Sequence, residues 1–335
     1  MNEFALIARH FTRASRDADV VLGVGDDAAI LRASPGRDWL VTVDMMVEGR
    51  HFLAGADPAR LGHKLLAVNL SDIAAMGGRP RFALLAGALP DADDAWLAAF
   101  SRGLFELART HDVDIVGGDT TRGPRTLSLT LIGDVAAGTA LRRDGARDGD
   151  DVYVSGTLGD AMLALAALQG RTAIDVATLA DVRRRLESPT PRVALGNALR
   201  GIASAAIDVS DGLVGDLGHI LERSRVGAQI ELAELPRSDA LDAKLRSTAR
   251  PAALAWLVAG GDDYELCFTA PAARRDAVAA AARHSATAVS RIGRVTSVRG
   301  LAVTDEDGAP LAALPQSFDH FGGEDPPPIA RAPLR

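Results

Sequence analysis

Residues 58–80 read PARLGHKLLAVNLSDIAAMGGRP, and this stretch predicts a long helix with a polar site on one face. Leucine, valine and isoleucine recur at helical spacing until two glycines and a proline end the pattern. Asp72 lies among these apolar residues, and Asn69 precedes it by three positions on the same face. A carboxylate in such surroundings needs a cation or several hydrogen-bond donors. Asp72 is therefore either a metal ligand or a buried carboxylate held by backbone amides.

Predicted strands and helices alternate along the rest of the chain, so we expect the α/β or α+β class. A polar, glycine-containing stretch at 142–151 separates two such series and marks a domain boundary. We expect one domain over residues 1–140, a second over 141–321, and a disordered tail over 322–335 that contains three consecutive prolines. The clearest predicted strands are 39–43, 113–116, 151–154 and 206–209.

Aspartates at the ends of predicted elements are the second strong feature. Three of them lie at or just beyond apolar strands, and another follows a glycine turn. Strand ends are where α/β folds bind ligands, hard cations prefer carboxylate oxygens, and glycines let a phosphate approach the backbone. Asp211 precedes a predicted helix, where capping that helix explains it equally well. The six aspartates that together predict a divalent-cation site are Asp27, Asp44, Asp72, Asp119, Asp208 and Asp211.

The composition argues against several classes of protein. The 335 residues carry a net charge of −7, which is unfavourable for general binding to nucleic acid or anionic membranes. The longest apolar stretch, 82–89, is far shorter than the roughly 20 residues of a membrane helix. No basic segment precedes an apolar run at the N-terminus, so we predict no secretory signal. Cys267 is the single cysteine, which excludes an internal disulfide, and we expect a cytoplasmic protein.

The common nucleotide-binding and nucleophile motifs do not explain this chain. Residues 23–28 match the spacing of the dinucleotide fingerprint, but two aspartates there would repel a pyrophosphate, and Pro35 follows too soon for a long helix. Neither a P-loop nor a Gly-x-Ser-x-Gly elbow occurs. Cys267 lies in the middle of a predicted strand, as a core thiol would.

Nine short motifs, in order, resemble the thiamine-monophosphate kinase family, which shares a superfamily with aminoimidazole ribonucleotide synthetase and selenophosphate synthetase. The resemblance extends over residues 4–321, and the ordered set is far more specific than any one member. The motifs are GDDA (25–28), VDMMVEGRHF (43–52), NLSDIAAMG (69–77), GGDTT (117–121), RDGA (143–146), SGTLGD (155–160), DVSDGL (208–213), GGDDYEL (260–266) and FDHF (318–321).

The resemblance implies transfer of the ATP γ-phosphate to thiamine monophosphate, giving thiamine diphosphate. It also implies a two-domain fold like that of aminoimidazole ribonucleotide synthetase, with an N-terminal metal- and nucleotide-binding domain whose sheet pairs across a homodimer. The six aspartates would match the family's ligands for several Mg²⁺ ions. The family usually has glutamate at Asp262, so this side chain is one methylene shorter, and often tyrosine or tryptophan at Phe318. The implied ATP contacts are Gly118, Arg143 and Ser210, and the implied substrate contacts are His51, Asp262 and Phe318.

The residues agree with direct transfer between two phosphates. Each phosphate carries roughly −1.5 to −2 charges near neutral pH, so the acceptor oxygen is already deprotonated and needs no general base. The chain holds only two lysines, and we expect bound metal ions to supply most of the neutralising charge. We therefore predict positioning and charge neutralisation, with no catalytic nucleophile and no phosphoenzyme.

Other functions remain open from the sequence. Aminoimidazole ribonucleotide synthetase, which uses ATP to activate an amide oxygen, is the second candidate, although the acidic pair in residues 25–28 and the motif at 318–321 favour the kinase. Selenophosphate synthetase is disfavoured, because no N-terminal cysteine and lysine pair is present. A protein that binds ATP without turnover is a third possibility. Single residues also have ordinary explanations: His51 as a loop residue bonded to backbone, Arg143 as a solvated arginine, and Phe318 as an anchor for the tail.

Overall fold

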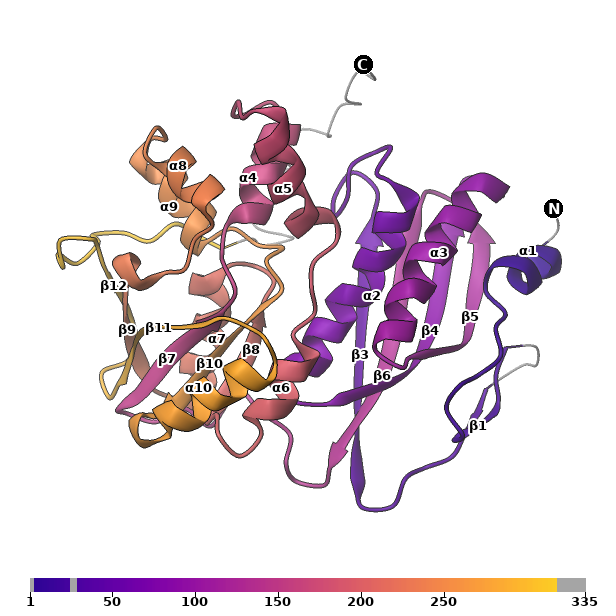
Figure 1. Ribbon diagram of the computed structural model, residues 1–335, viewed down its shortest axis with the longest axis horizontal. Coiled ribbons are helices and arrows are strands. Elements are labelled where there is room, and N and C mark those ends of the chain that lie inside the picture. The colour runs from indigo at the N-terminus through magenta and orange to yellow at the C-terminus, as the bar shows by residue number, and fades with distance from the viewer. Residues whose placement is uncertain (1–2, 25–28, 318–335) are drawn as a thin grey trace. The chain divides into compact units, whose positions relative to one another are not determined.

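The computed structural model describes residues 3–24 and 29–317, and these fall into two compact units (Figure 1). Of these described residues, unit 1 comprises 3–24, 29–73 and 79–138, and unit 2 comprises 74–78 and 139–317. Asp27, Phe318 and the tail predicted to be disordered lie outside the described residues. Within the described ranges, no helix has the length and apolar character needed to cross a membrane.

Unit 1 is built on a four-stranded sheet with the order β3-β6-β4-β5. β3 and β4 each pair antiparallel with β6, whereas β4 and β5 are parallel. α2 and α3 cover one face of this sheet (Figure 1). The elements of unit 1 are α1 (Glu3–His10), β1 (Val20–Leu22), β2 (Ile30–Leu31), β3 (Arg37–Val47), α2 (Pro58–Ala75), β4 (Arg79–Leu89), α3 (Asp94–Thr110), β5 (Asp114–Arg122) and β6 (Thr126–Ala136).

Two glycines let α2 and α3 touch backbone to backbone. A Cβ atom on Gly62 would lie 2.2 Å from the Phe100 carbonyl oxygen, and one on Gly103 would lie 1.8 Å from the Ala59 carbonyl oxygen. No side chain fits at either position, so these glycines fix how closely the helices pack. The helix predicted from the pattern at 58–80 is confirmed and begins at Pro58.

The two faces of β3 differ sharply. Val41, Val43 and Met45 are 67%, 62% and 58% exposed. Thr42, which lies between two of them, points at α2, where its hydroxyl bonds Asp72. Because β3 is also an edge strand of its sheet, unit 1 presents a row of exposed apolar side chains beside an open backbone edge.

Unit 2 contains a six-stranded sheet with the order β12-β9-β11-β7-β10-β8. All neighbours are antiparallel except β9 and β12, and the core packs side chains of the sheet against α4 and α7. The elements are β7 (Asp150–Ser155), α4 (Asp160–Leu168), α5 (Val176–Glu187), α6 (Val193–Leu199), β8 (Ala205–Val209), α7 (Leu213–Ser224), β9 (Gly227–Glu231), η1 (Leu232–Glu234), α8 (Asp239–Leu245), α9 (Arg250–Val258), β10 (Glu265–Pro271), η2 (Ala272–Arg274), α10 (Arg275–His284), β11 (Val289–Thr296) and β12 (Gly300–Thr304).

Strands of unit 1 run further than the sequence predicts. β3 continues past Asp44 to Val47, and β5 continues past Asp119 to Arg122. Both aspartates therefore lie within strands and not at their ends. The reason is that strand pairing uses backbone groups, so a ladder continues through polar residues that end an apolar pattern.

Candidate functional site

In unit 1, Asp72 of α2 faces the edge strand β3. Its carboxylate accepts a hydrogen bond from the Thr42 hydroxyl. Side chains alternate along a strand, so Asp44 lies on the same face of β3 as Thr42. Asp44 is paired in the sheet with Leu129, which is fully buried. The two carboxylates are thus both directed into the layer between β3 and α2.

The donor set in this layer fits a hard cation. Asn69, one turn before Asp72, is fully buried, and its Oδ1 has no hydrogen-bond partner in the described part of the chain. Carboxylate, hydroxyl and amide oxygens are the ligands that Mg²⁺ and Ca²⁺ accept. The oxygen atoms of Asp44, Asp72, Thr42 and Asn69 are therefore chemically suited to hold Mg²⁺.

Asp119 lies elsewhere in unit 1. It is in β5, on the edge of the sheet opposite β3, so three strand spacings of roughly 4.8 Å, or about 14 Å, separate the two strands. Asp119 is paired with Ala86, and it points away from the face on which its neighbour Thr120 packs under α3. The structure does not bring Asp119 to Asp44 and Asp72.

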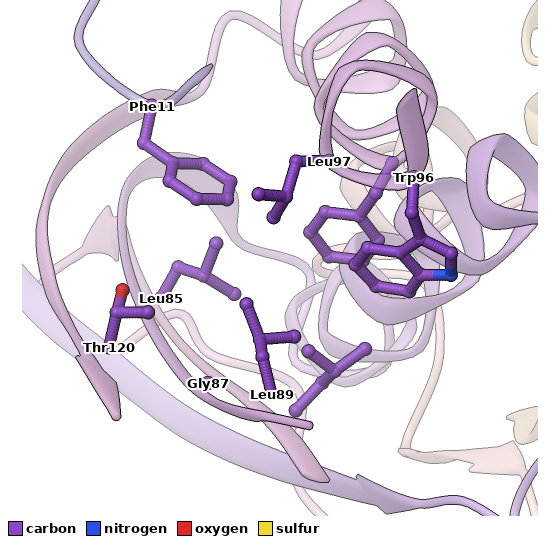
Figure 2. A pocket seen from close by; sticks show the side chains of 9 residues that line it. Phe11, Leu85, Gly87, Leu89, Trp96, Leu97 and Thr120 are labelled. Atoms are coloured by element: carbon purple, nitrogen blue, oxygen red, sulfur yellow. The ribbon is translucent and has the colours of Figure 1, made fainter. Parts of the chain in front are cut away.

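Figure 2 shows the gap beneath α3 into which Thr120 points, with Phe11, Leu85 and Leu97 around it. The gap is lined almost entirely by apolar side chains, and its volume is about 10 Å³. That volume holds no more than a single water molecule. This gap is a packing defect of the unit 1 core, and it is too small to receive a nucleotide or a thiamine ring.

Gly118 lies where β5 approaches β4 most closely. A Cβ atom there would be 1.9 Å from the Leu85 carbonyl oxygen. Any larger residue would separate the two strands. The packing of β5 against β4 therefore requires glycine at position 118, independently of the contact with ATP that the resemblance implies.

In the described ranges, no group of three or more His, Cys, Asp or Glu side chains is placed so that it could hold a metal ion. The predicted set of six is divided: Asp44 and Asp72 converge in unit 1, Asp119 lies on the other edge of that sheet, and Asp208 and Asp211 belong to unit 2. Asp27 is outside the described residues.

In unit 2, two predicted loops lie directly against each other at the end of the edge strand β8. The backbone N–H of Asp262 donates to the Ser210 carbonyl oxygen at 2.8 Å, and the N–H of Tyr264 donates to the Val209 carbonyl oxygen at 2.8 Å. A Cβ atom on Gly261 would lie 2.2 Å from the Ser210 carbonyl oxygen. The structure therefore brings together a residue predicted to bind ATP and one predicted to bind the substrate.

Asp216 holds the first of these loops in place. Its carboxylate accepts the backbone N–H groups of Ser210, Asp211 and Gly212 at 3.0, 3.1 and 3.1 Å. Burial, and then the charge of Asp211, raise the pKa of Asp216 to about 7. Gly212 is the N-cap of α7, so the alternative in which Asp211 caps this helix is wrong. Asp216 was not predicted from the sequence, although an acid one turn into a helix after a Ser-Asp-Gly turn is the signal that could have found it.

The second loop contains two residues in the left-handed region. Asp262 has φ +66° and Tyr264 has φ +50°, and the Tyr264 hydroxyl donates to Asp262 Oδ1 at 3.1 Å. Non-glycine residues adopt this conformation at a cost, and such strain is typical of functional sites. The close approach of Gly261 to Ser210 leaves little room for another course of the chain, so contact with the β8 loop enforces the strained conformation.

Two acids beside this loop are structural. Glu265 is fully buried and bound by the guanidinium groups of Arg185 and Arg192, at 2.5 to 2.6 Å. Asp263 accepts the Gly159 N–H at 3.0 Å, and burial raises the pKa of Asp263 well above its usual value. Neither was predicted as a site residue. A glutamate leading into an apolar strand was the available signal, because a buried charge requires a partner.

The other predicted residues are in different surroundings. His51 Nδ1 accepts the backbone N–H of Val47 at 3.0 Å, as expected for a histidine that shapes a loop. Arg143 is exposed, and the carbonyl oxygen of its neighbour Arg142 accepts the N–H of Ala206, at the start of β8. Ser210 follows the far end of that strand, about 13 Å away at roughly 3.3 Å per residue. Within unit 2, Arg143 is therefore not adjacent to Ser210.

The chain approaches the same part of unit 2 just before Phe318. Ser317 Oγ accepts the backbone N–H of Gly215, in the first turn of α7, at 2.8 Å. Leu311 and Leu314 pack against the core of unit 2. The segment leading to Phe318 is thus fixed near the loop at 208–212, although its weak pattern did not predict a fixed position.

Comparisons with known proteins show which family this chain resembles in sequence and fold. The N-terminal domain of AIR synthase related proteins matches residues 25–135, and the C-terminal domain matches residues 147–306. The thiamine-monophosphate kinase of Escherichia coli strain K12 is 47% identical over 95% of this chain and 98% of its own. The crystal structure of thiamine-monophosphate kinase from Stenotrophomonas maltophilia K279a, 47% identical, matches with a TM-score of 0.84 over 93% of this chain and 98% of that one. AaThiL complexed with AMPPCP and TMP, 31% identical, matches with a TM-score of 0.76 over 87% and 89%.

Proposed function

The chain belongs to the thiamine-monophosphate kinase family of AIR synthase related proteins, and from this membership we propose how its residues act. It is an ATP-dependent phosphotransferase that converts thiamine monophosphate to thiamine diphosphate. The two-domain fold of that family is the fold of this chain. The activity follows from 47% identity over 95% of the chain, and this match favours the kinase over the two other members of the superfamily.

The observation that supports a mechanism best is the contact between the loops at 208–212 and 260–264. Ser210, proposed for ATP, and Asp262, proposed for thiamine monophosphate, are joined by a backbone hydrogen bond of 2.8 Å. Loops in such contact can hold a donor and an acceptor phosphate beside each other. Fixing two reactants in line is a large part of catalysis when no covalent step is needed.

The six aspartates are proposed to hold Mg²⁺: Asp27, Asp44, Asp72, Asp119, Asp208 and Asp211. The oxygen-only donor set between β3 and α2 supports this assignment for Asp44 and Asp72. When bound, Mg²⁺ supplies positive charge against the phosphate oxygens. The chain's own part is to orient those oxygens and to exclude water.

The remaining roles are proposals of the same kind. Gly118, Arg143 and Ser210 are assigned to ATP, and His51, Asp262 and Phe318 to thiamine monophosphate. Support for Phe318 comes from Ser317, which is fixed on the first turn of α7. No nucleophile or general base is assigned, because the acceptor phosphate is already ionised at neutral pH.

A cytoplasmic homodimer is the proposed form of the enzyme. Domain 1–140 would bind metal and nucleotide and form the dimer, with 141–321 as the second domain. The exposed apolar face of the edge strand β3 supports the dimer, because a second copy would cover Val41, Val43 and Met45. The single cysteine is buried and free, as suits a reducing compartment.

Incubation with ATP, MgCl₂ and thiamine monophosphate tests the function, with products separated by chromatography. Stoichiometric ADP and thiamine diphosphate are expected. ATP binding without thiamine diphosphate would instead favour a non-catalytic nucleotide-binding protein. Formation of aminoimidazole ribonucleotide from its formylglycinamidine precursor would favour the synthetase.

A further inference from the structure

Asn69 of α2 carries a buried oxygen atom that the protein leaves unsatisfied. The side chain is fully buried, and its Nδ2 donates to the Leu65 carbonyl oxygen at 2.9 Å. Its Oδ1 has no partner in the described part of the chain. The other buried side-chain atoms without a partner there are the Nε atoms of three arginines, each of which bonds an acid through another nitrogen. Among these four buried atoms, Asn69 Oδ1 is therefore the only hydrogen-bond acceptor.

The position of Asn69 along α2 places it near the level of Asp44 along β3. The connection from Val47 to Pro58 reverses the chain, so α2 runs back along β3 (Figure 1). Thr42 and Asp72 fix the register between the two elements. Asn69 is about 4.5 Å before Asp72 along the helix, and Asp44 is about 6.6 Å beyond Thr42 along the strand, in the same direction.

The orientation of the amide also matters. Because Nδ2 is held by the carbonyl oxygen of Leu65, one turn toward the start of the helix, Oδ1 is the amide atom that remains for a ligand. Asp72 lies on the same face of the helix, three residues later. An acceptor without a donor, at the level of two carboxylates, suits a ligand that is itself positive or brings its own donors.

We propose that Asn69 Oδ1 completes the divalent-cation site of Asp44 and Asp72, by binding the cation or a water molecule in its coordination shell. This inference rests on the proposed function, in which those two aspartates hold Mg²⁺. An amide oxygen adds a hard ligand without adding charge, so it can strengthen the site without increasing the repulsion between carboxylates. Asn69 Oδ1 then lacks a partner only while no cation is bound.

The test compares Asn69→Leu with wild type in thermal melts, first after EDTA treatment and then as MgCl₂ is added. Leucine removes the orphaned oxygen, so the cation-free variant should melt at the same or a higher temperature. The Mg²⁺ concentration for half of the maximal rise in melting temperature should increase at least about tenfold. Asn69→Asp, which keeps an oxygen at this position, should restore the response to Mg²⁺.

Asn197→Leu is the matched control. Asn197 also lies in a helix and donates to the carbonyl oxygen four residues earlier, at 2.9 Å, but its Oδ1 is bonded by Arg200. This variant should lower the melting temperature in EDTA and leave the response to Mg²⁺ unchanged.

Asp72→Asn separates the failure of this inference from failure of the proposed function. The proposed metal site is wrong if Asp72→Asn responds to Mg²⁺ as wild type does, or if wild type does not respond. In either case the proposed role of Asn69 is wrong as well. If Asp72→Asn loses the response while Asn69→Leu keeps it, only the role of Asn69 is overturned. A lower melting temperature of Asn69→Leu in EDTA, with an unchanged Mg²⁺ response, would mark Asn69 as a purely structural residue.

Discussion

Asp134 in unit 1 and Asp216 in unit 2 are almost equally buried, at 1% and 3% exposure, yet their pKa values move in opposite directions. Burial alone would raise the pKa of Asp134, but the guanidinium groups of Arg79 and Arg37 outweigh it and hold the pKa below its usual value. Arg81 also donates to Asp134, at 3.3 Å. Asp216 accepts three backbone N–H groups and, among the described residues, forms no ion pair.

The difference separates two kinds of buried acid in this chain, those paired with arginine and those bound by backbone N–H groups. With 35 arginines among its 37 basic residues, it neutralises structural carboxylates directly, as at Asp134 and Glu265. At Asp216 the donors are backbone N–H groups, whose dipoles stabilise a carboxylate less than a full charge does. The pKa of Asp216 therefore stays raised, whereas that of Asp134 is lowered.

The largest expected effect is the loss of turnover on substitution of Asp72. We assign Asp72, like Asp211, to the proposed metal site, whereas Asp134 is a structural acid. Asp72→Asn should lower turnover at least about 100-fold, since charge stabilisation at the phosphates is lost. The melting temperature in EDTA should be unchanged or higher, because a partly buried charge is gone. Steady-state kinetics and thermal melts measure both. A rate near that of wild type would place Asp72 with the structural acids instead.

Asp134→Asn should have the largest effect on stability. It leaves three arginines around a neutral side chain, and breaking a buried ion pair costs about 3–5 kcal/mol in the free energy of unfolding. Urea denaturation at pH 7 measures the loss. The control is Asp181→Asn, which removes an exposed pair with Arg184 and should cost less than about 1 kcal/mol. Equal costs for the two variants would contradict the structural role of Asp134.

The pH dependence of stability should reveal Asp216. Its pKa is about 7 in the folded protein and 3.8 in the unfolded chain. Between these values the unfolded state releases a proton that the folded state keeps, so stability falls as pH rises from about 4 to 7. The difference of roughly three pKa units corresponds to a loss on the order of 4 kcal/mol.

Comparison of wild type with Asp216→Asn isolates this contribution. In EDTA, urea midpoints measured from pH 4 to pH 8 should converge at low pH and diverge toward pH 7, with wild type losing more stability. Asp134 and Asp151 have lowered pKa values, so their contributions fade as pH falls, in the opposite direction. Parallel pH profiles for wild type and Asp216→Asn would show that Asp216 is ionised in the folded protein.

The smallest expected effect concerns Phe318, which lies outside the described residues. An aromatic face against the cationic thiazolium ring is worth roughly 0.5 to 2 kcal/mol. Phe318→Ala should raise the KM for thiamine monophosphate several-fold and leave the KM for ATP nearly unchanged. Phe321→Ala should lower the melting temperature instead. If Phe318→Ala shifts only the melting temperature, its ring anchors the tail and does not bind the substrate.

The sequence predicted much of the fold because its apolar patterns are strong. The helix that begins at Pro58 and the strand at 151–154 are examples. Prediction failed where tertiary context decides the outcome. α5 was not predicted because charged residues, including three consecutive arginines, interrupt its apolar pattern. β5 continues past its apolar segment because strand pairing uses the backbone.

The sequence predicted which residue types form the candidate site, but it predicted only part of how they are arranged in space. Local spacing placed Asn69 and Asp72 on one helical face, but only the structure shows Thr42 opposite Asp72 or Asp262 against Ser210. Both contacts join residues far apart in the sequence. Asp216 acts through backbone N–H groups of a turn, which residue identities alone do not reveal.

Initial rates of phosphate transfer to thiamine monophosphate and to unphosphorylated thiamine, measured side by side with saturating MgATP, test the central claim most directly. That claim is direct transfer between two phosphates on a site that neutralises charge and holds no general base. The rate with thiamine should be at least about 100-fold lower, because an alcohol acceptor needs a base to remove its proton. Comparable rates with the two acceptors would contradict this account and would direct the search for a base to His51.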